Sequence, residues 1–333
     1  MVSIVEKIYS EQARREQGIF WSDETHSWVV LNSRIGEAIL RSTQFAVHDR
    51  TPFLREIAEK HNLDIRRILD GLRDAPLSNN GEAHRKARRR LAAALAPRVD
   101  MAVAAFESQC AVEVDRAFGA GEFVDMFSDV LLPSMNAALV QLGGREINAA
   151  SFKIASPTQL FSSSQIFSGQ RLAKLNADIE DAPSDQNSPE CPHLMTLFAG
   201  DPTLGSLGQS LIENIRSNRG RPLCSFDWSA EINRTSLPFA ERVASCDMEL
   251  EGAHVRKDDP ISVYIGAFGS DGSLHFGTGA HRCLGEQLAR QLWQRLRLTL
   301  ARRPEMLEVE DVVYRGADFA FVMPIKIQTR VIR

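Results

Sequence analysis

One short segment constrains this chain more than any other: Phe-Gly-Thr-Gly-Ala-His-Arg-Cys-Leu-Gly at residues 276–285. Two glycines precede Cys283, and a leucine-rich segment follows it. Glycine permits tight turns with positive φ and a close approach of two backbones. A cysteine at a helix start lies near free backbone N–H groups and the positive end of the helix dipole, and both stabilise a thiolate. The segment therefore predicts a tight loop that presents the sulfur of Cys283.

The same segment resembles the cysteine-ligand loop of bacterial cytochromes P450, Phe-Gly-x-Gly-x-His-x-Cys-x-Gly, at every fixed position. The resemblance implies that Cys283 is the axial iron ligand of haem b (iron protoporphyrin IX), that Phe276 packs beside the sulfur and that His281 bonds a haem propionate. The glycines of the pattern are Gly277, Gly279 and Gly285. The alternatives are a buried cysteine after a glycine turn, and a nucleotide-binding loop, for which the glycine spacing is wrong.

Residues 84–88, His-Arg-Lys-Ala-Arg, form the second segment of interest. On a helix, His84 and Arg88 lie one turn apart on the same face. The segment resembles a His-x-x-x-Arg helix of the same family. That resemblance implies that both side chains contact the haem propionates, and the alternative is a solvated basic helix.

Residues 231–252, EINRTSLPFAERVASCDMELEG, form the third segment. They resemble the family's Glu-x-x-Arg helix, the proline after it, an Arg-x-Ala strand and a polar hairpin. The i, i+3 spacing of Glu231 and Arg234 predicts that they pair on one helical face. By resemblance this pair braces the core beside the haem, and Arg242 reaches a propionate.

Ala199 to Thr203 is the best match to the family's oxygen-activation helix, which carries an acid followed by a threonine that deliver protons. Thr203 fits the threonine, but Pro202 takes the place of the acid and Asp201 lies one residue early. Two interpretations stay open: a helix kinked by proline, or a turn that starts a shorter helix. Thr203 and Asp201 are the candidate proton-relay residues.

The chain is several tens of residues shorter than is usual for the family. Residues 144–192 are too few for the usual substrate-covering helices, and a partner chain could supply the missing cover. Only seven residues separate Phe268 from Phe276, and none is the arginine that normally joins the Glu-x-x-Arg pair.

Apolar periodicity predicts a mainly α fold with minor β structure: the cytochrome P450 fold, truncated in its distal helices and in the meander before the cysteine loop. A single domain over residues 1–333 is expected. The predicted helices cover residues 35–40, 82–97, 101–118, 123–142, 204–216 and 284–303, and the strands cover 28–31, 248–250, 261–265 and the C-terminal tail. In the last helix, leucines repeat every four residues, which predicts a buried stripe.

Composition excludes several classes of protein. The net charge of −4 gives no indication of nucleic-acid binding. No segment approaches the roughly 20 apolar residues of a membrane span, and the charged start of the chain lacks the apolar run of a secretory signal, so a cytoplasmic protein is expected. The five cysteines are widely spaced and odd in number, which argues against a disulfide framework. The sequence contains no CxxC pair, which argues against a structural zinc site.

These features predict a haem-thiolate monooxygenase that oxidises a small organic substrate, by family analogy in specialised metabolism. A ferredoxin-type electron donor is expected to dock on exposed basic residues of the second segment, Arg85, Lys86, Arg89 and Arg90. One alternative is a peroxygenase or a haem enzyme for rearrangement or dehydration. Another is a non-catalytic relative that serves as partner or activator of another enzyme.

Overall fold

The computed structural model describes residues 18–144, 146–147, 160, 168–180, 199–267, 274–315 and 322–333. Its helices are α3 (Ser33–Arg41), α4 (Thr51–His61), α5 (Arg66–Asp74), α6 (Gly81–Leu95), α7 (Val99–Ala120), α8 (Leu132–Gln141), α10 (Gly169–Glu180), α12 (Asp201–Ser217) and α13 (Glu286–Leu300). Within this part of the chain, no helix is both long and apolar enough to cross a bilayer. Helices predominate, as the sequence predicts.

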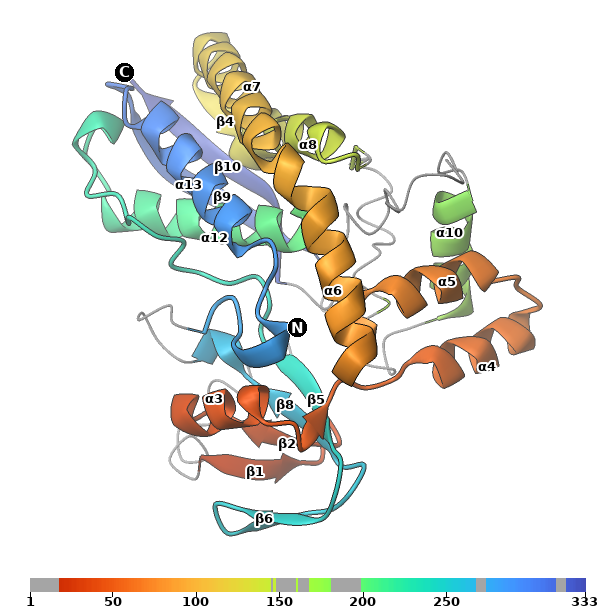
Figure 1. Cartoon of the computed structure of the whole chain (residues 1–333). Helices are drawn as coiled ribbons and strands as arrows, with labels where there is room; N and C mark the ends of the chain where they lie inside the picture. Colours follow the sequence, from red (N-terminus) through yellow and green to blue (C-terminus); the bar gives the residue numbers. More distant parts are fainter. Residues whose placement is uncertain are drawn as a thin grey trace.

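The strands form three small sheets. The largest has the order β1 (Ile19–Ser22), β2 (Ser27–Val30), β8 (Pro260–Val263), β5 (Ala240–Ala244) and β3 (Phe45–Ala46). The second has the order β4 (Phe123–Asp125), β10 (Pro324–Ile332) and β9 (Met306–Tyr314), and β6 (Met248–Leu250) pairs with β7 (Ala253–Val255). Figure 1 shows the five-stranded sheet at one end of the molecule, α7, α8, α12 and α13 at the other, and α6 running between them.

The main hydrophobic core lies among α7, α8, α12, α13 and the sheet of β4, β10 and β9. The predicted leucine stripe is confirmed for Leu288, Leu292, Leu296 and Leu300, which are buried on α13. Each buried leucine stabilises the fold by about 2 kcal/mol relative to an exposed one. Leu284, which lies before the helix begins, is only half-buried.

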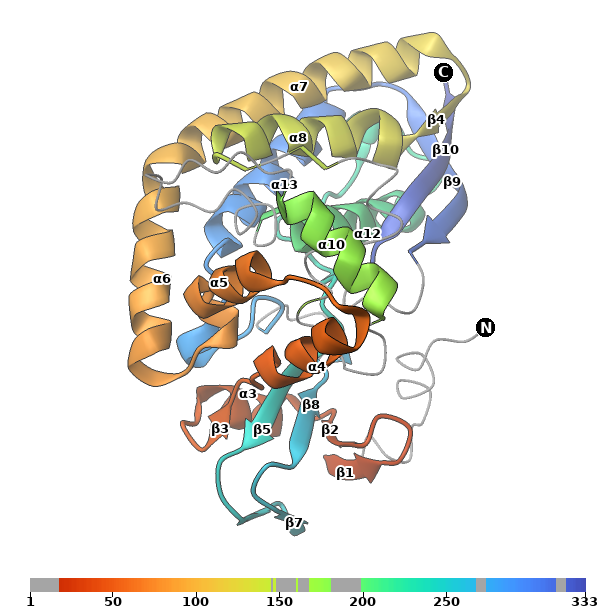
Figure 2. The same ribbon diagram turned by 90° about the vertical axis from the view of Figure 1, so that its right-hand side faces the viewer.

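A separate apolar cluster joins α4, α5 and α10, which lie side by side in both views (Figure 2). It includes Leu54, Ile68 and Leu172. Part of the stretch 144–192, expected to be too short for the usual covering helices, thus forms α10. The rest of that stretch lies mostly outside the described residues.

The single helix that the sequence predicts over residues 123–142 is wrong at its start. Val124 lies in strand β4, where it pairs with Thr329 of β10. The carboxylate of Asp125 accepts the backbone N–H of Phe127 at 3.1 Å, so this side chain caps the helical structure that follows. That structure begins with a π-helical stretch, Met126–Leu131, and continues as α8.

The predicted Glu-x-x-Arg helix is also wrong, because residues 229–236 form an irregular segment with bends at residues 230, 231 and 236, which lies along α12 and which we call the strap. Polar side chains of α12 take up backbone N–H groups of this strap: Asn214 bonds residue 229 at 2.9 Å, Ser210 residue 234 at 3.2 Å and Ser206 residue 236 at 3.1 Å. Residues 206, 210 and 214 form one stripe at helical spacing. Backbone donors satisfied in this way have no need of a helix of their own.

Candidate functional site: the cysteine loop and its cationic cluster

The predicted tight loop is present before α13. Gly277 and Gly279 have positive φ angles of 66° and 69°, and the backbone N–H of Cys283 donates to the carbonyl of Phe276 at 2.8 Å. A Cβ at Gly279 would lie 2.5 Å from the carbonyl oxygen of Leu40 on α3. Glycine is required there for the loop to approach α3, whereas a Cβ at Gly277 meets no heavy atom closer than 4.0 Å.

Two opposing effects act on the thiol of Cys283. Burial of the sulfur is the larger and raises its pKa, while the backbone N–H groups of Gly285 and Glu286 donate to it and lower its pKa. The residue as a whole is nevertheless exposed, so solvent reaches part of it. The expected N–H groups are therefore present, but the protein alone does not favour the thiolate. A cation beside the sulfur would do so.

Four side chains with cationic or titratable groups meet near this loop, and we call them the cationic cluster: His84 and Arg88 of α6, Arg242 of β5 and His281 of the cysteine loop. The rings of His84 and His281 lie 4.1 Å apart between centroids. Burial, followed by the charge of Arg242, lowers the pKa of His281 to about 3. Burial, then the charges of Arg88 and Arg242, lowers the pKa of His84. Burial alone lowers the pKa of Arg242 to about 10.

The cationic cluster has unused hydrogen-bonding capacity. Among the described residues, Nε2 of His84 and Nδ1 of His281 are buried without a hydrogen-bond partner. Arg242 is 8% exposed, and its guanidinium donates to the backbone carbonyl of Glu241. A buried polar group without a partner costs about 1–3 kcal/mol, and clustered positive charge costs more. A ligand with carboxylates would relieve both costs, so these residues fit the two propionates of a haem.

Asp201, Pro202 and Thr203 form the first turn of α12. Residues 199 and 200 directly before it are π-helical, and residues 181–198 lie outside the described ones, so both interpretations of Pro202, a kink or a helix start, stay open. Thr203 is buried. The carboxylate of Asp201 pairs with Arg315 at 3.2 Å, and their side chains are 3% and 1% exposed.

Glu231 and Arg234 do not pair with each other, in contrast to the expectation. Glu231 pairs with Arg290 of α13, and Arg234 pairs with Glu213 of α12 at 3.2 Å. The i, i+3 pairing of side chains depends on helical geometry, which this segment does not have. The predicted brace is therefore divided between two helices.

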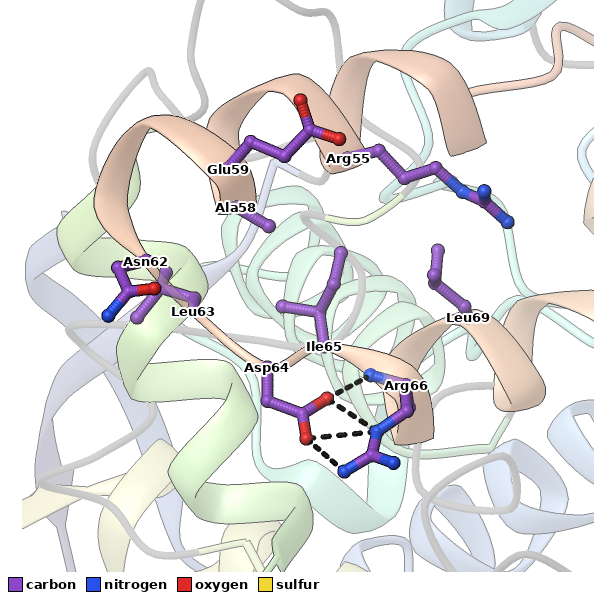
Figure 3. Close-up of a pocket in the computed structure, with 9 residues that line it drawn as sticks. All are labelled: Arg55, Ala58, Glu59, Asn62, Leu63, Asp64, Ile65, Arg66 and Leu69. Carbon is purple, nitrogen blue, oxygen red and sulfur yellow. Dashed lines mark hydrogen bonds and ion pairs between the residues drawn. The ribbon is translucent and has the colours of Figure 1, made fainter.

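The structure also contains a surface cleft of about 470 Å³ between α4 and α5 (Figure 3). Its walls include Arg55, Leu63, Ile65 and Leu69, and Asp64 pairs with Arg66 at its edge. None of the residues that line it belongs to the cysteine loop or the cationic cluster. The cleft thus carries no part of this site.

Sequence reasoning missed two arginines with a structural part in the site, Arg290 and Arg315. Neither lies in a motif that marks its partner, since Arg315 meets Asp201 from a position 114 residues away. The polar stripe of α12 at residues 206, 210 and 214 could have been found, because its four-residue spacing is visible in the sequence.

No family model and no curated protein matches the sequence. Solved structures do match. P450BioI, in complex with an acyl carrier protein ligated to hexadec-9Z-enoic acid, is 18% identical, with a TM-score of 0.71 and coverage of 98% of each chain. Epothilone D-bound cytochrome P450epoK is 16% identical, with a TM-score of 0.72, over 97% of this chain and 95% of that chain.

A third structure, cytochrome P450 MoxA from Nonomuraea recticatena, is 20% identical, with a TM-score of 0.66, over 98% of this chain and 95% of that chain. Identities this low carry no information on activity, but the TM-scores and coverage agree on the arrangement of helices and sheets. The chain has the cytochrome P450 fold.

Proposed function

We propose that this protein binds haem b through the sulfur of Cys283 and acts as a monooxygenase on a small organic substrate. The observation that carries the proposal is the cationic cluster beside the cysteine loop. Its buried histidine nitrogens have no partner, and Arg242 has no carboxylate partner among the described residues. Such a set is costly in a protein that binds no anion there.

Each part of the site then has a defined task. Cys283 would hold the haem through its sulfur, and the bound haem would supply the chemistry for inserting oxygen into a substrate. The N–H groups of Gly285 and Glu286 hold the charge of the sulfur of Cys283, and Phe276 holds the loop closed through its carbonyl. His84, Arg88, Arg242 and His281 receive the propionates.

Proton delivery is assigned to Thr203, which the first turn of α12 holds in the protein interior. Asp201 is the other candidate, but its carboxylate is engaged by Arg315. A buried ion pair of this kind opens only at a cost of several kcal/mol. We therefore assign the relay to the Thr203 hydroxyl with ordered water, and Asp201 to holding the first turn of α12 in place.

Electrons would come from a ferredoxin-type donor that docks on α6. Arg85, Lys86, Arg89 and Arg90 are exposed there. Three of them pair with acids: Arg85 and Arg89 with Glu82, and Arg90 with Asp74. This leaves Lys86 as the main candidate for contact with an acidic donor, and Lys86→Glu should slow electron transfer without changing the haem spectrum.

The Asp201–Arg315 pair also favours a second candidate, a peroxygenase. A peroxide supplies its own protons and electrons, so it has less need of an acid at the start of α12. The substrate is proposed only as a class. The similar structures include complexes with epothilone, a biosynthetic intermediate of aurachin RE and an acylated carrier protein. Specialised metabolites and carrier-bound acyl chains are therefore the first substrates to assay.

The test is the absorption spectrum of the purified, haem-reconstituted protein, reduced under carbon monoxide. A strongly red-shifted Soret band is expected for the wild type and for Cys246→Ala, whose cysteine is free and exposed. The band should be lost in Cys283→Ala. No haem band in the wild type would overturn the proposal and favour a non-catalytic partner. Turnover with peroxide, but not with dioxygen and a donor, would favour the second candidate.

A further inference from the structure

We propose that Arg290 is a positioning residue that fixes the cysteine loop against α13 and the strap, and so sets the place of the Cys283 sulfur. The inference rests on the proposed function, in which that sulfur is the iron ligand. Arg290 itself touches neither the sulfur nor the cationic cluster in any contact of the described residues. Its effect would pass through the residues that hold the loop.

One guanidinium joins three segments of the chain. Its carbon lies over the ring of Phe276 in the cysteine loop, 5.0 Å from the centroid. Its nitrogens donate to the carboxylate of Glu286 in the first turn of α13, at 3.0 and 3.1 Å. It also pairs with Glu231 of the strap. A planar, multi-donor group can make all three contacts at once, and an ammonium cannot.

The two loop-side partners of Arg290 are the residues that hold Cys283. The carbonyl of Phe276 accepts the Cys283 N–H at 2.8 Å, and the N–H of Glu286 is one of the two that donate to the sulfur. A shift of either residue therefore moves the sulfur or removes a donor from it. Groups that orient a metal ligand in this indirect way commonly change affinity by about 10- to 100-fold when removed.

The route of the strap gives an independent reason for this role. Glu231 has left the helical pair with Arg234 that the sequence predicts, and the segment between Phe268 and Phe276 contains no arginine to complete such a pair. The carboxylate of Glu231 is 62% exposed, yet it meets Arg290. Arg290 thus links the strap to the cysteine loop through charged side chains, beside the neutral bond that the Thr235 hydroxyl donates to the carbonyl of His275 at 3.4 Å.

The chain offers a matched control in Arg282. This arginine donates to the same carboxylate, that of Glu286, at 2.6 and 2.9 Å, but within the described part of the chain its side chain bonds neither Phe276 nor the strap. The two variants Arg290→Gln and Arg282→Gln each remove one ion pair to Glu286. Only the first also removes the ring contact and the link to Glu231.

The experiment measures hydrogen exchange at the amide of Cys283 and the rate of haem loss to a haem-scavenging globin, in the haem-loaded protein. Arg290→Gln should speed exchange at this amide by about tenfold and haem loss by at least as much, with part of the carbon monoxide complex losing its red-shifted band. Arg290→Lys should behave nearly as Arg290→Gln, because it keeps the charge without the fork. Arg282→Gln should stay within about twofold of the wild type.

Equal behaviour of Arg290→Gln and Arg282→Gln in both measurements would overturn the positioning role. If the wild type takes up no haem, the proposed function fails instead. The exchange comparison still decides whether Arg290 fixes the loop, since it needs no haem. Global unfolding by Arg290→Gln would be recognised by equal acceleration at the buried amides of α7, and Arg290→Lys, which keeps the charge, then supplies the comparison.

Discussion

The cysteine loop and the start of α12 pack on one hydrophobic core, but they differ in whether their buried charged groups have partners of opposite charge. Beside the loop, His84, Arg242 and His281 are gathered with no carboxylate bound to them among the described residues. At the start of α12, the buried carboxylate of Asp201 has a buried counter-charge in Arg315, and the N–H groups of the strap have polar partners. Gathered cationic groups without a carboxylate indicate an anion-binding site, whereas a buried charge with its counter-charge indicates a structural joint.

The largest effect should come from breaking the buried ion pair between Asp201 and Arg315. Arg315→Met leaves the carboxylate of Asp201 buried without its cation, which should cost about 3–5 kcal/mol of unfolding free energy. Arg242→Met removes a buried cation that lacks a carboxylate partner, so the protein without haem should keep its stability or gain some. Urea unfolding measures both, and equal destabilisation by the two variants would abolish the contrast between the regions.

A second contrast lies within the cysteine loop itself. Gly279→Ala combines a positive φ with a clash against Leu40 and should cost about 3 kcal/mol, while Gly277→Ala has the positive φ alone and should cost about 1–2 kcal/mol. Thermal or urea unfolding of the two variants checks the difference. If Gly277→Ala proves the more harmful, the close approach to α3 is not what fixes the loop.

The sequence was most informative where one local segment carries its own partners. The turns of the cysteine loop are closed by local hydrogen bonds, from the N–H of Gly277 to the carbonyl of Leu274 and from that of Cys283 to the carbonyl of Phe276, and glycines with a cysteine at fixed spacing predicted it. The α13 stripe followed from the four-residue repeat of leucine. The strap was missed because its hydrogen bonds go to α12, at least 15 residues away, and helical spacing within Glu-x-x-Arg says nothing of such partners.

The same reason explains the ambiguity at Asp201. Proline at residue 202 suits either a kink or a helix start, and the choice depends on the residues before 199, which no local pattern of the sequence determines. Arg315 then determines what Asp201 can do, and a distant arginine leaves no local signal. The four residues of the cationic cluster come from α6, β5 and the cysteine loop, which are far apart in the sequence. Only the family resemblance predicted that they lie near one another.

The pH dependence of the unfolding free energy gives a smaller, directional test of the cationic cluster. The pKa of His84 is lowered in the folded protein, so the unfolded chain binds more protons once the pH falls below about 6.5. His84 therefore contributes its full stability above that pH, and the protein should lose up to about 1.4 kcal/mol per pH unit below it, until the lowered pKa is reached.

Urea midpoints between pH 7.5 and 5.5 measure this slope. His84→Gln should reduce the slope and leave the part that comes from His281, whose pKa is also lowered. Bound haem should flatten it further, because propionates beside the two rings raise their pKa values. An unchanged slope in both His84→Gln and His281→Gln would show that the cationic cluster does not set the acid response. The charges at the start of α12 are paired, so Ser206→Ala in the strap joint should leave the slope as it is.

The smallest effect concerns Glu231 and Arg234, which bond different helices. Their coupling energy distinguishes the observed strap from the helix that the sequence predicts. Glu231 and Arg234 are 62% and 53% exposed and bond different helices. A double-mutant cycle with Glu231→Gln and Arg234→Gln should give a coupling energy near zero, and Arg234→Gln alone should cost about 0.5 kcal/mol or less. A helix with the two side chains paired on one face, as the sequence predicts, would instead give a coupling of about 0.3–0.5 kcal/mol, or several times that if the pair were buried. The cycle, measured by urea unfolding, therefore decides whether the connection between α12 and the cysteine loop passes through a helix or through the strap.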